Sequence, residues 1–263
     1  MKKEMVTERD ESISNKTAER LASMIMKARH LVGFTGAGIS TESGLADFRG
    51  PDGVWTRQDK GLPPPRSRRI EDVRPNRAHI IVADLIDQGF MKFLISQNVD
   101  GLHIMSGVPV EKIAELHGNH YLMVCDHCNK KMTYQEAGWD RRRFGPGYRR
   151  YKAVSGQPGC PNCEGRLYSS IVNFGDPLPE RDFNESMEHA EKADLMLIIG
   201  SSLVVTPAAD LPLITKRKGG SLVIINKGET ALDKIADIRI WAGAGDTLEK
   251  IMKKIKSKHS TSA

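Results

Sequence analysis

Four cysteines in two pairs carry the clearest chemical signal in the chain. Cys125 and Cys128 form one pair, Cys160 and Cys163 form the other, and no further cysteine occurs among the 263 residues. Four thiolates suit a tetrahedral zinc ion, and a full set of protein ligands leaves no position open for a substrate. No apolar stretch follows Met1, so we expect no secretory signal and an intracellular protein with reduced thiols. The pairs therefore predict a structural zinc site rather than disulfides.

A second chemical signal is the polar or glycine-rich residues that follow three apolar runs. The three clusters span residues 35–38, 97–100 and 200–202. In open parallel sheets, ligands bind beside the carboxyl ends of the strands. Gly36 and Gly38 make a tight turn whose backbone N–H groups can approach a phosphate. These clusters predict a nucleotide site at one edge of a sheet.

The glycine turn does not complete the fingerprint of a hydride-transferring dehydrogenase. That fingerprint needs a third glycine where this chain has Thr41, and an acidic residue at a strand end about 20 residues further on. The corresponding stretch here is 50–53, Gly-Pro-Asp-Gly, which is no strand end. An ordinary dehydrogenase is therefore disfavoured.

The elements that must position these residues alternate between strands and helices. We expect helices over 17–29, 76–89, 180–193, from about 207, and over 246–257, and strands over 30–34, 92–96, 195–199, 222–225 and 238–241. We expect a loose end over 1–14 and a long irregular loop over 50–75, which is rich in Gly, Pro and Arg. The alternation predicts an α/β fold with a Rossmann-like, doubly wound parallel sheet. The predicted domains are 1–119 with 171–263, and a zinc-binding insert over 120–170.

The charge balance is moderately basic, with 39 Lys and Arg against 33 Asp and Glu, a net charge of +6. The excess gathers at 66–69, at 141–152 inside the insert, and at 250–258. A solvated surface is the usual explanation of such runs; the alternative is an acidic partner such as nucleic acid or a chromatin-like surface. No apolar run approaches the roughly 18 residues of a membrane span, so we expect no membrane partner. We expect a cytoplasmic location, with the nucleus as the alternative.

Six motifs in order resemble those of the sirtuins, the NAD-dependent protein deacylases. They are Gly36-Ala37-Gly38-Ile39-Ser40 with Asp47-Phe48-Arg49, Gln97-Asn98-Val99-Asp100, Leu116-His117-Gly118-Asn119, the two cysteine pairs, Phe174-Gly175-Asp176, and Gly200-Ser201-Ser202 with Asn226. The segment 48–55 resembles the nuclear-type branch, whose members deacylate histones and can ADP-ribosylate proteins. The stretch 129–159 between the cysteine pairs is long for the family.

The resemblance implies that acyl-lysine and NAD give lysine, nicotinamide and O-acyl-ADP-ribose. His117 would act as the general base and Asn98 would order the ribose and nearby water. The resemblance further implies a set of NAD-binding residues: Gly36, Ala37, Gly38, Thr41, Asp47, Phe48, Arg49, Trp55, Gln97, Asn98, Asp100, His117, Gly200, Ser201, Ser202, Asn226 and Ala244. Val172, Phe174 and Gly175 would bind the acyl-lysine substrate.

Two other functions stay open at this point. The same residues could transfer ADP-ribose to a protein, which would make the chain a mono-ADP-ribosyltransferase. The arginines inside the insert also fit a zinc-ribbon protein that binds nucleic acid, although such a protein has no need of Asn98 or His117 at these positions.

Overall fold

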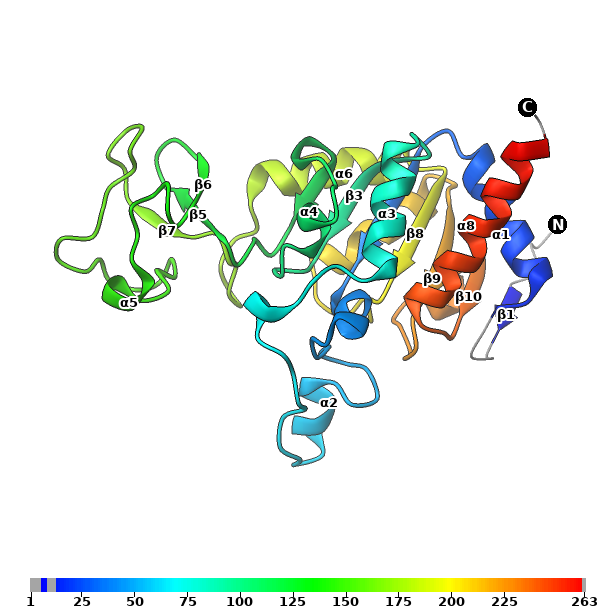
Figure 1. The fold of residues 1–263 in the computed structure, drawn as a ribbon, viewed down its shortest axis with the longest axis horizontal. Helices are drawn as coiled ribbons and strands as arrows, with labels where there is room; N and C mark the ends of the chain where they lie inside the picture. Colours follow the sequence, from blue (N-terminus) through cyan, green and yellow to red (C-terminus); the bar gives the residue numbers. More distant parts are fainter. Residues whose placement is uncertain (1–5, 9–12, 262–263) are drawn as a thin grey trace.

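A seven-stranded parallel sheet forms the centre of the larger domain (Figure 1). The structure is a computed structural model that describes residues 6–8 and 13–261. Within these residues the strand order is β1-β10-β9-β8-β2-β3-β4, and every neighbouring pair is parallel. The strands are β1 (Val6–Glu8), β2 (Leu31–Thr35), β3 (Met91–Ser96), β4 (Ile113–Glu115), β8 (Leu195–Ile199), β9 (Ser221–Ile225) and β10 (Ile238–Ile240). From β4 to β10 this is the order of a doubly wound nucleotide-binding sheet, as predicted.

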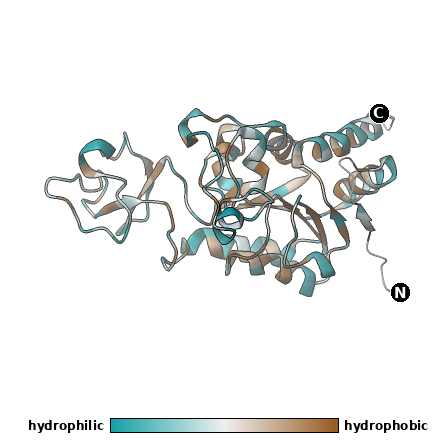
Figure 2. Cartoon of the chain, turned by 90° about the horizontal axis from the view of Figure 1, so that it is seen from below, coloured by the Kyte–Doolittle hydropathy of each residue, from teal (hydrophilic) through white to brown (hydrophobic). Residues whose placement is uncertain are grey.

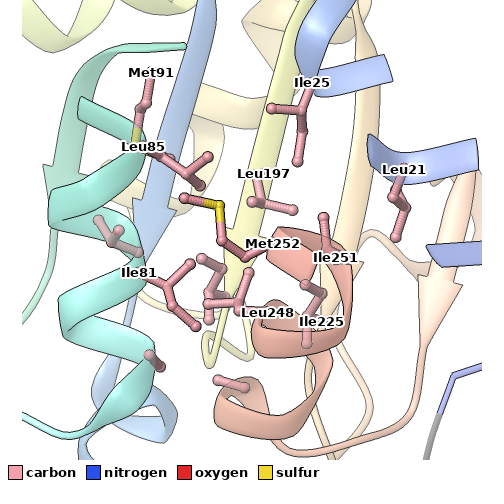
Figure 3. Packing of buried hydrophobic residues seen from close by; sticks show 14 of the residues in the cluster. Leu21, Ile25, Ile81, Leu85, Met91, Leu197, Ile225, Leu248, Ile251 and Met252 are labelled. Carbon is pink, nitrogen blue, oxygen red and sulfur yellow. The ribbon is translucent and has the colours of Figure 1, made fainter. Parts of the chain in front are cut away.

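Helices cover both faces of the sheet, which explains why its central strands are apolar throughout. Alternate residues of one strand belong to different clusters: Leu197 of β8 packs with the helices α1 (Asn15–Lys27), α3 (Arg77–Asp87) and α8 (Ala244–Thr261) (Figure 3). Ile198 faces the opposite side, where α6 (Glu180–Lys192) and α7 (Leu211–Arg217) lie. A strand buried on both faces needs a continuous apolar run rather than an alternating one.

The zinc-binding insert is a separate small unit with its own core. It holds a three-stranded antiparallel sheet in the order β6-β5-β7, and Figure 2 shows it set to one side of the larger domain. Its elements are β5 (Leu122–Cys125), β6 (Lys131–Thr133), β7 (Leu167–Ser169) and the short helix α5 (Arg141–Phe144). Met123, Trp139 and Leu167 belong to its buried cluster. All of these elements lie within residues 120–170.

The prediction of a loose end over 1–14 is wrong at Val6–Glu8, which forms β1 and pairs with β10. Residues 1–5 and 9–12 of that prediction lie outside the described residues. A three-residue edge strand carries too little periodicity to be recognised in the sequence. The carboxylate of Glu8 accepts hydrogen bonds from Ser14 and Thr17, which ties this strand to the start of α1.

The expected irregular loop over 50–75 is also partly wrong, because it contains the helix α2 (Val54–Asp59). The short elements α2, α4 (Leu102–Met105) and β4 were not predicted, nor were the 3₁₀ turns at Ala37–Ser43, Ile70–Asp72, Val110–Lys112 and Asp233–Ile235. The helix predicted from about 207 begins as a 3₁₀ turn at Ala208–Asp210 and continues as α7. Such elements of one turn or one strand pair depend on tertiary contacts. No helix in the part of the chain that the structure describes is long and apolar enough to cross a membrane.

Candidate functional site

The two central strands of the sheet, β2 and β8, end in glycine loops that touch each other. The Gly38 N–H donates to the Gly200 carbonyl over 2.8 Å, and the Gly36 N–H donates to the Ile199 carbonyl over 3.1 Å. A Cβ atom on Gly38 would lie 2.8 Å from the Gly200 backbone, so only glycine fits there. This is the point where the strand order reverses, and doubly wound sheets bind ligands in the crevice beside it.

A cavity of about 830 Å³ opens at this point and lies within the size range of small-molecule sites. It is lined by most of the residues that the sequence singled out: Gly36, Ala37, Gly38, Asp47, Phe48, Arg49, Trp55, Gln97, Asn98, Asp100, His117, Val172, Phe174, Gly175, Gly200, Ser201, Ser202 and Asn226. A second cavity of about 330 Å³ adjoins it and is lined by the two remaining ones, Thr41 and Ala244. Among the residues singled out by the sequence, Gly38, Asp47, Gly200 and Asn226 line both cavities.

His117 is held in one tautomer beside the cavity. Its Nδ1 lies 2.9 Å from the backbone carbonyl of Gln97. Because a carbonyl can only accept, Nδ1 must carry the proton, which leaves Nε2 with a free lone pair. Burial lowers the pKa of His117 from its ordinary value, and the bond to the Gln97 carbonyl opposes part of that shift. The imidazole is therefore neutral near pH 7 and able to accept a proton.

Three aromatic rings surround the mouth of the cavity. The Trp55 ring lies 4.8 Å from that of Phe48 and 5.9 Å from that of Phe174, measured between ring centres. The Arg49 guanidinium stands 5.1 Å from the centre of the Trp55 ring and pairs with Asp59. Phe174 is 74% exposed and Phe48 is 47% exposed, so these rings can cover a bound ligand.

The four cysteines converge in the insert. All four sulfur atoms lie within 4.8 Å of one another, with 3.5 Å between the Cys125 and Cys163 sulfurs and 3.8 Å between those of Cys128 and Cys160. Tetrahedral zinc with bonds of about 2.3 Å places its sulfur ligands about 3.8 Å apart. The spacing is far beyond the roughly 2.05 Å of a disulfide, and all four thiols are free. The donor set therefore fits structural zinc.

Comparison with known proteins decides the family. A model of the Sir2 family matches residues 63–207. The chain belongs to the Sir2 family. An NAD-dependent protein deacetylase of Caldivirga maquilingensis is 36% identical over 253 residues, which cover 90% of this chain and 93% of the relative.

Two further comparisons extend this result. The NAD-dependent protein deacetylase SRT1 of Arabidopsis thaliana is 38% identical over 91% of this chain, but the match spans only 49% of that protein's length. Among solved structures, a Sir2 protein with a p53 peptide and NAD+ is 34% identical, covers 89% of this chain and 97% of its own, and has a TM-score of 0.68. The sirtuin resemblance, the fold and the requirement for NAD are thereby confirmed.

Ser40 belongs to the first of the six motifs, but the sequence alone assigned it no role in the site. The buried hydroxyl of Ser40 donates to Asp100 Oδ2 over 2.7 Å and accepts from Asn98 Nδ2 over 3.2 Å. Burial raises the pKa of Asp100, and the bond from Ser40 opposes that shift. Ser40 thus fixes the side chains of two residues that the motifs implicate. Its place in the first motif was the signal in the sequence that could have suggested the role.

Contacts within the strand-end loops orient several other predicted residues. Gln97 and Ser201 approach each other across the cavity at 3.4 Å, which joins the ends of β3 and β8. Thr41 donates to the Gly38 carbonyl, and the Asn226 side chain donates to the Gly228 carbonyl. These residues therefore stabilise the turns that shape the two cavities. Their contacts to NAD remain predictions.

Proposed function

We propose that the chain is an NAD-dependent protein-lysine deacylase that releases nicotinamide and O-acyl-ADP-ribose. The observation that carries this proposal is His117. It is neutral and fixed in one tautomer, and it lines the same cavity as the Gln97-Asn98-Val99-Asp100 motif and the glycine loops. Family membership and the names of the relatives point to the same activity.

The position of each residue in the cavity suits it to a different part of the reaction. The Arg49 guanidinium suits the pyrophosphate of NAD. The expectation that the Gly36 and Gly38 N–H groups approach a phosphate is wrong for this structure, because both groups already donate to backbone carbonyls. Bound NAD supplies a ribose carbon from which nicotinamide can leave. Asp100, which Ser40 orients, suits the carboxamide of nicotinamide. Phe48 excludes water from the face of the ribose that nicotinamide leaves. His117 Nε2 accepts the proton of a ribose hydroxyl, since its Nδ1 is held by the Gln97 carbonyl.

Mass spectrometry of an acetyl-lysine peptide incubated with the protein and NAD tests the reaction. We expect loss of the acetyl group from the peptide together with NAD-dependent formation of O-acetyl-ADP-ribose. Gain of ADP-ribose by the protein or peptide, with the acetyl group retained, would instead support the mono-ADP-ribosyltransferase alternative. No change in either would refute both.

A finer proposal concerns the partner of the basic insert. We propose that α5 and its neighbours attract an acidic partner such as nucleic acid, because Arg141, Arg142 and Arg143 occupy one exposed turn. Arg141 is partly engaged, since its guanidinium lies 4.9 Å from the centre of the Tyr134 ring. Phosphate contacts are electrostatic and weaken steeply with salt.

DNA binding at two salt concentrations tests this finer proposal. Changing the three α5 arginines to alanine should weaken binding while leaving turnover of a short neutral peptide unchanged. Absence of DNA binding at low salt would mean that the arginine cluster is only a solvated surface.

We also propose an intracellular location, cytoplasmic or nuclear, because four free thiols suit a reducing compartment.

A further inference from the structure

An arginine of the zinc-binding insert pairs with a buried carboxylate of the larger domain. Arg150 Nε donates to Asp176 Oδ1 over 2.7 Å. The Asp176 side chain is only 6% exposed, whereas that of Arg150 is 57% exposed. A buried carboxylate is costly without a partner, so the insert supplies the charge that this position needs. The pKa of Asp176 is held below its ordinary value: burial raises it, but the bonds from Arg150 and Asn173 outweigh that effect.

Asp176 closes a tight turn at the rim of the cavity. The Asp176 N–H donates to the Asn173 carbonyl over 2.9 Å, and the Asn173 N–H donates to Asp176 Oδ2 over 3.1 Å. Gly175 has a φ of +81°, which glycine adopts without strain. A Cβ atom on Gly175 would lie 2.5 Å from Arg150 Nη2, so the guanidinium covers the backbone of the turn.

The other end of the same segment is tied to His117. The Val172 N–H donates to the His117 carbonyl over 2.9 Å. Val172, Phe174 and Asp176 all line the larger cavity. The segment 172–176 is thus held at one end by the backbone of the general base and at the other by Arg150.

We propose that Arg150 is a positioning residue for the acyl-lysine substrate. It fixes the 173–176 turn before the peptide binds, so binding does not have to order that turn. This inference rests on the proposed function. The loops that line the NAD side of the cavity follow β2, β3 and β8, whereas the Arg150 guanidinium contacts the 173–176 turn, so we expect affinity for NAD to be independent of this pair.

Steady-state kinetics of Arg150→Ala, with an acetyl-lysine peptide and NAD varied separately, tests the proposal. We expect the KM for the peptide to rise about three- to tenfold, because a hydrogen-bonded charge pair with one exposed partner is lost. The KM for NAD and kcat should change less than about twofold. Arg150→Lys should restore much of the peptide affinity, since it returns the positive charge.

Two further variants separate positioning from a general effect of charge or stability. Arg181→Ala removes an arginine close to the same segment, but its partner Glu185 lies on the surface, so the KM for the peptide should stay unchanged. In an Asp176→Asn background, Arg150→Ala should add little, because the pair is already broken. Fully additive effects of the two substitutions would overturn the proposal.

Direct binding of the peptide by calorimetry makes the result independent of turnover. A folded, zinc-loaded Arg150→Ala protein that binds the peptide as tightly as the unmodified protein overturns the proposal. An equal loss of affinity for peptide and NAD overturns it as well. If the unmodified protein removes no acyl group, the proposed function fails, while the peptide dissociation constants still judge the role of Arg150.

Discussion

Replacement of Glu115 by glutamine should stabilise the protein at alkaline pH. Glu115 ends β4, two residues before His117, and is 8% exposed. Burial raises its pKa from 4.5 to about 7, although Asn119 Nδ2 donates to it over 2.7 Å and Lys131 favours its charged form. A glutamine keeps the shape and the acceptor oxygen but cannot ionise.

The magnitude follows from linkage between ionisation and folding. The carboxyl binds its proton more tightly in the folded chain, so it carries no penalty below pH 4.5, and stability is lost as the pH rises from 4.5 through about 7. At about 1.4 kcal/mol per unit, the full penalty is on the order of 3 kcal/mol. Between pH 5 and pH 8.5 the unmodified protein should therefore lose about 2–3 kcal/mol relative to Glu115→Gln.

Urea unfolding at pH 5 and pH 8.5 measures this difference directly, and Tm should differ by roughly 5–10 °C at pH 8.5. Glu111→Gln is the matched control, because it neutralises an exposed carboxyl only four residues earlier in the chain. Parallel stability curves for the unmodified protein and Glu115→Gln across this range would refute the reasoning.

Three further predictions concern the site and the metal. His117→Ala should abolish deacylation in a folded protein. In the unmodified protein, kcat/KM should decrease on acidification with a midpoint below pH 6.5, because burial lowers the pKa of His117. Near-normal turnover by the variant, or a midpoint above pH 6.5, contradicts this role. Asn98→Ala should reduce kcat at least about tenfold at unchanged Tm, since it removes an amide held by Ser40; an unchanged kcat contradicts the assignment. Cys160→Ser should lower Tm and zinc content together, because structural zinc contributes folding energy; a variant that melts unchanged and contains no less zinc than the unmodified protein argues against the site.

The parts of the fold that the sequence predicted are those with long, repeated signals. The apolar run at 195–199 is typical of a strand buried on both faces, and the helix over 180–192 shows its polar and apolar faces clearly. The cysteine spacing predicted a cluster that the structure brings together. In each case many residues, or residues of a rare type, indicated the same structure.

Local signals failed where tertiary contacts decide the conformation. β1 is three residues long and exists because β10 offers its edge. α2 begins where the Val54 N–H donates to the Asp47 carbonyl, a contact that composition cannot reveal in a stretch rich in glycine and proline. Ser40 was overlooked for the same reason, since its partners Asn98 and Asp100 lie more than fifty residues away.

The basic run of the insert shows most sharply what a sequence leaves undecided. Six Lys and Arg residues between 141 and 152 look equivalent in the chain, and a solvated surface or an acidic partner were the alternatives. The structure gives them different surroundings: Arg149 lies over the Tyr168 ring, Arg150 reaches the buried Asp176, and the α5 arginines stay at the surface. One run can therefore serve packing, positioning and solvation at once. Arg150 lies in the long stretch between the two cysteine pairs, and the clustered cysteines bring the two ends of that stretch together while Arg150 contacts the larger domain.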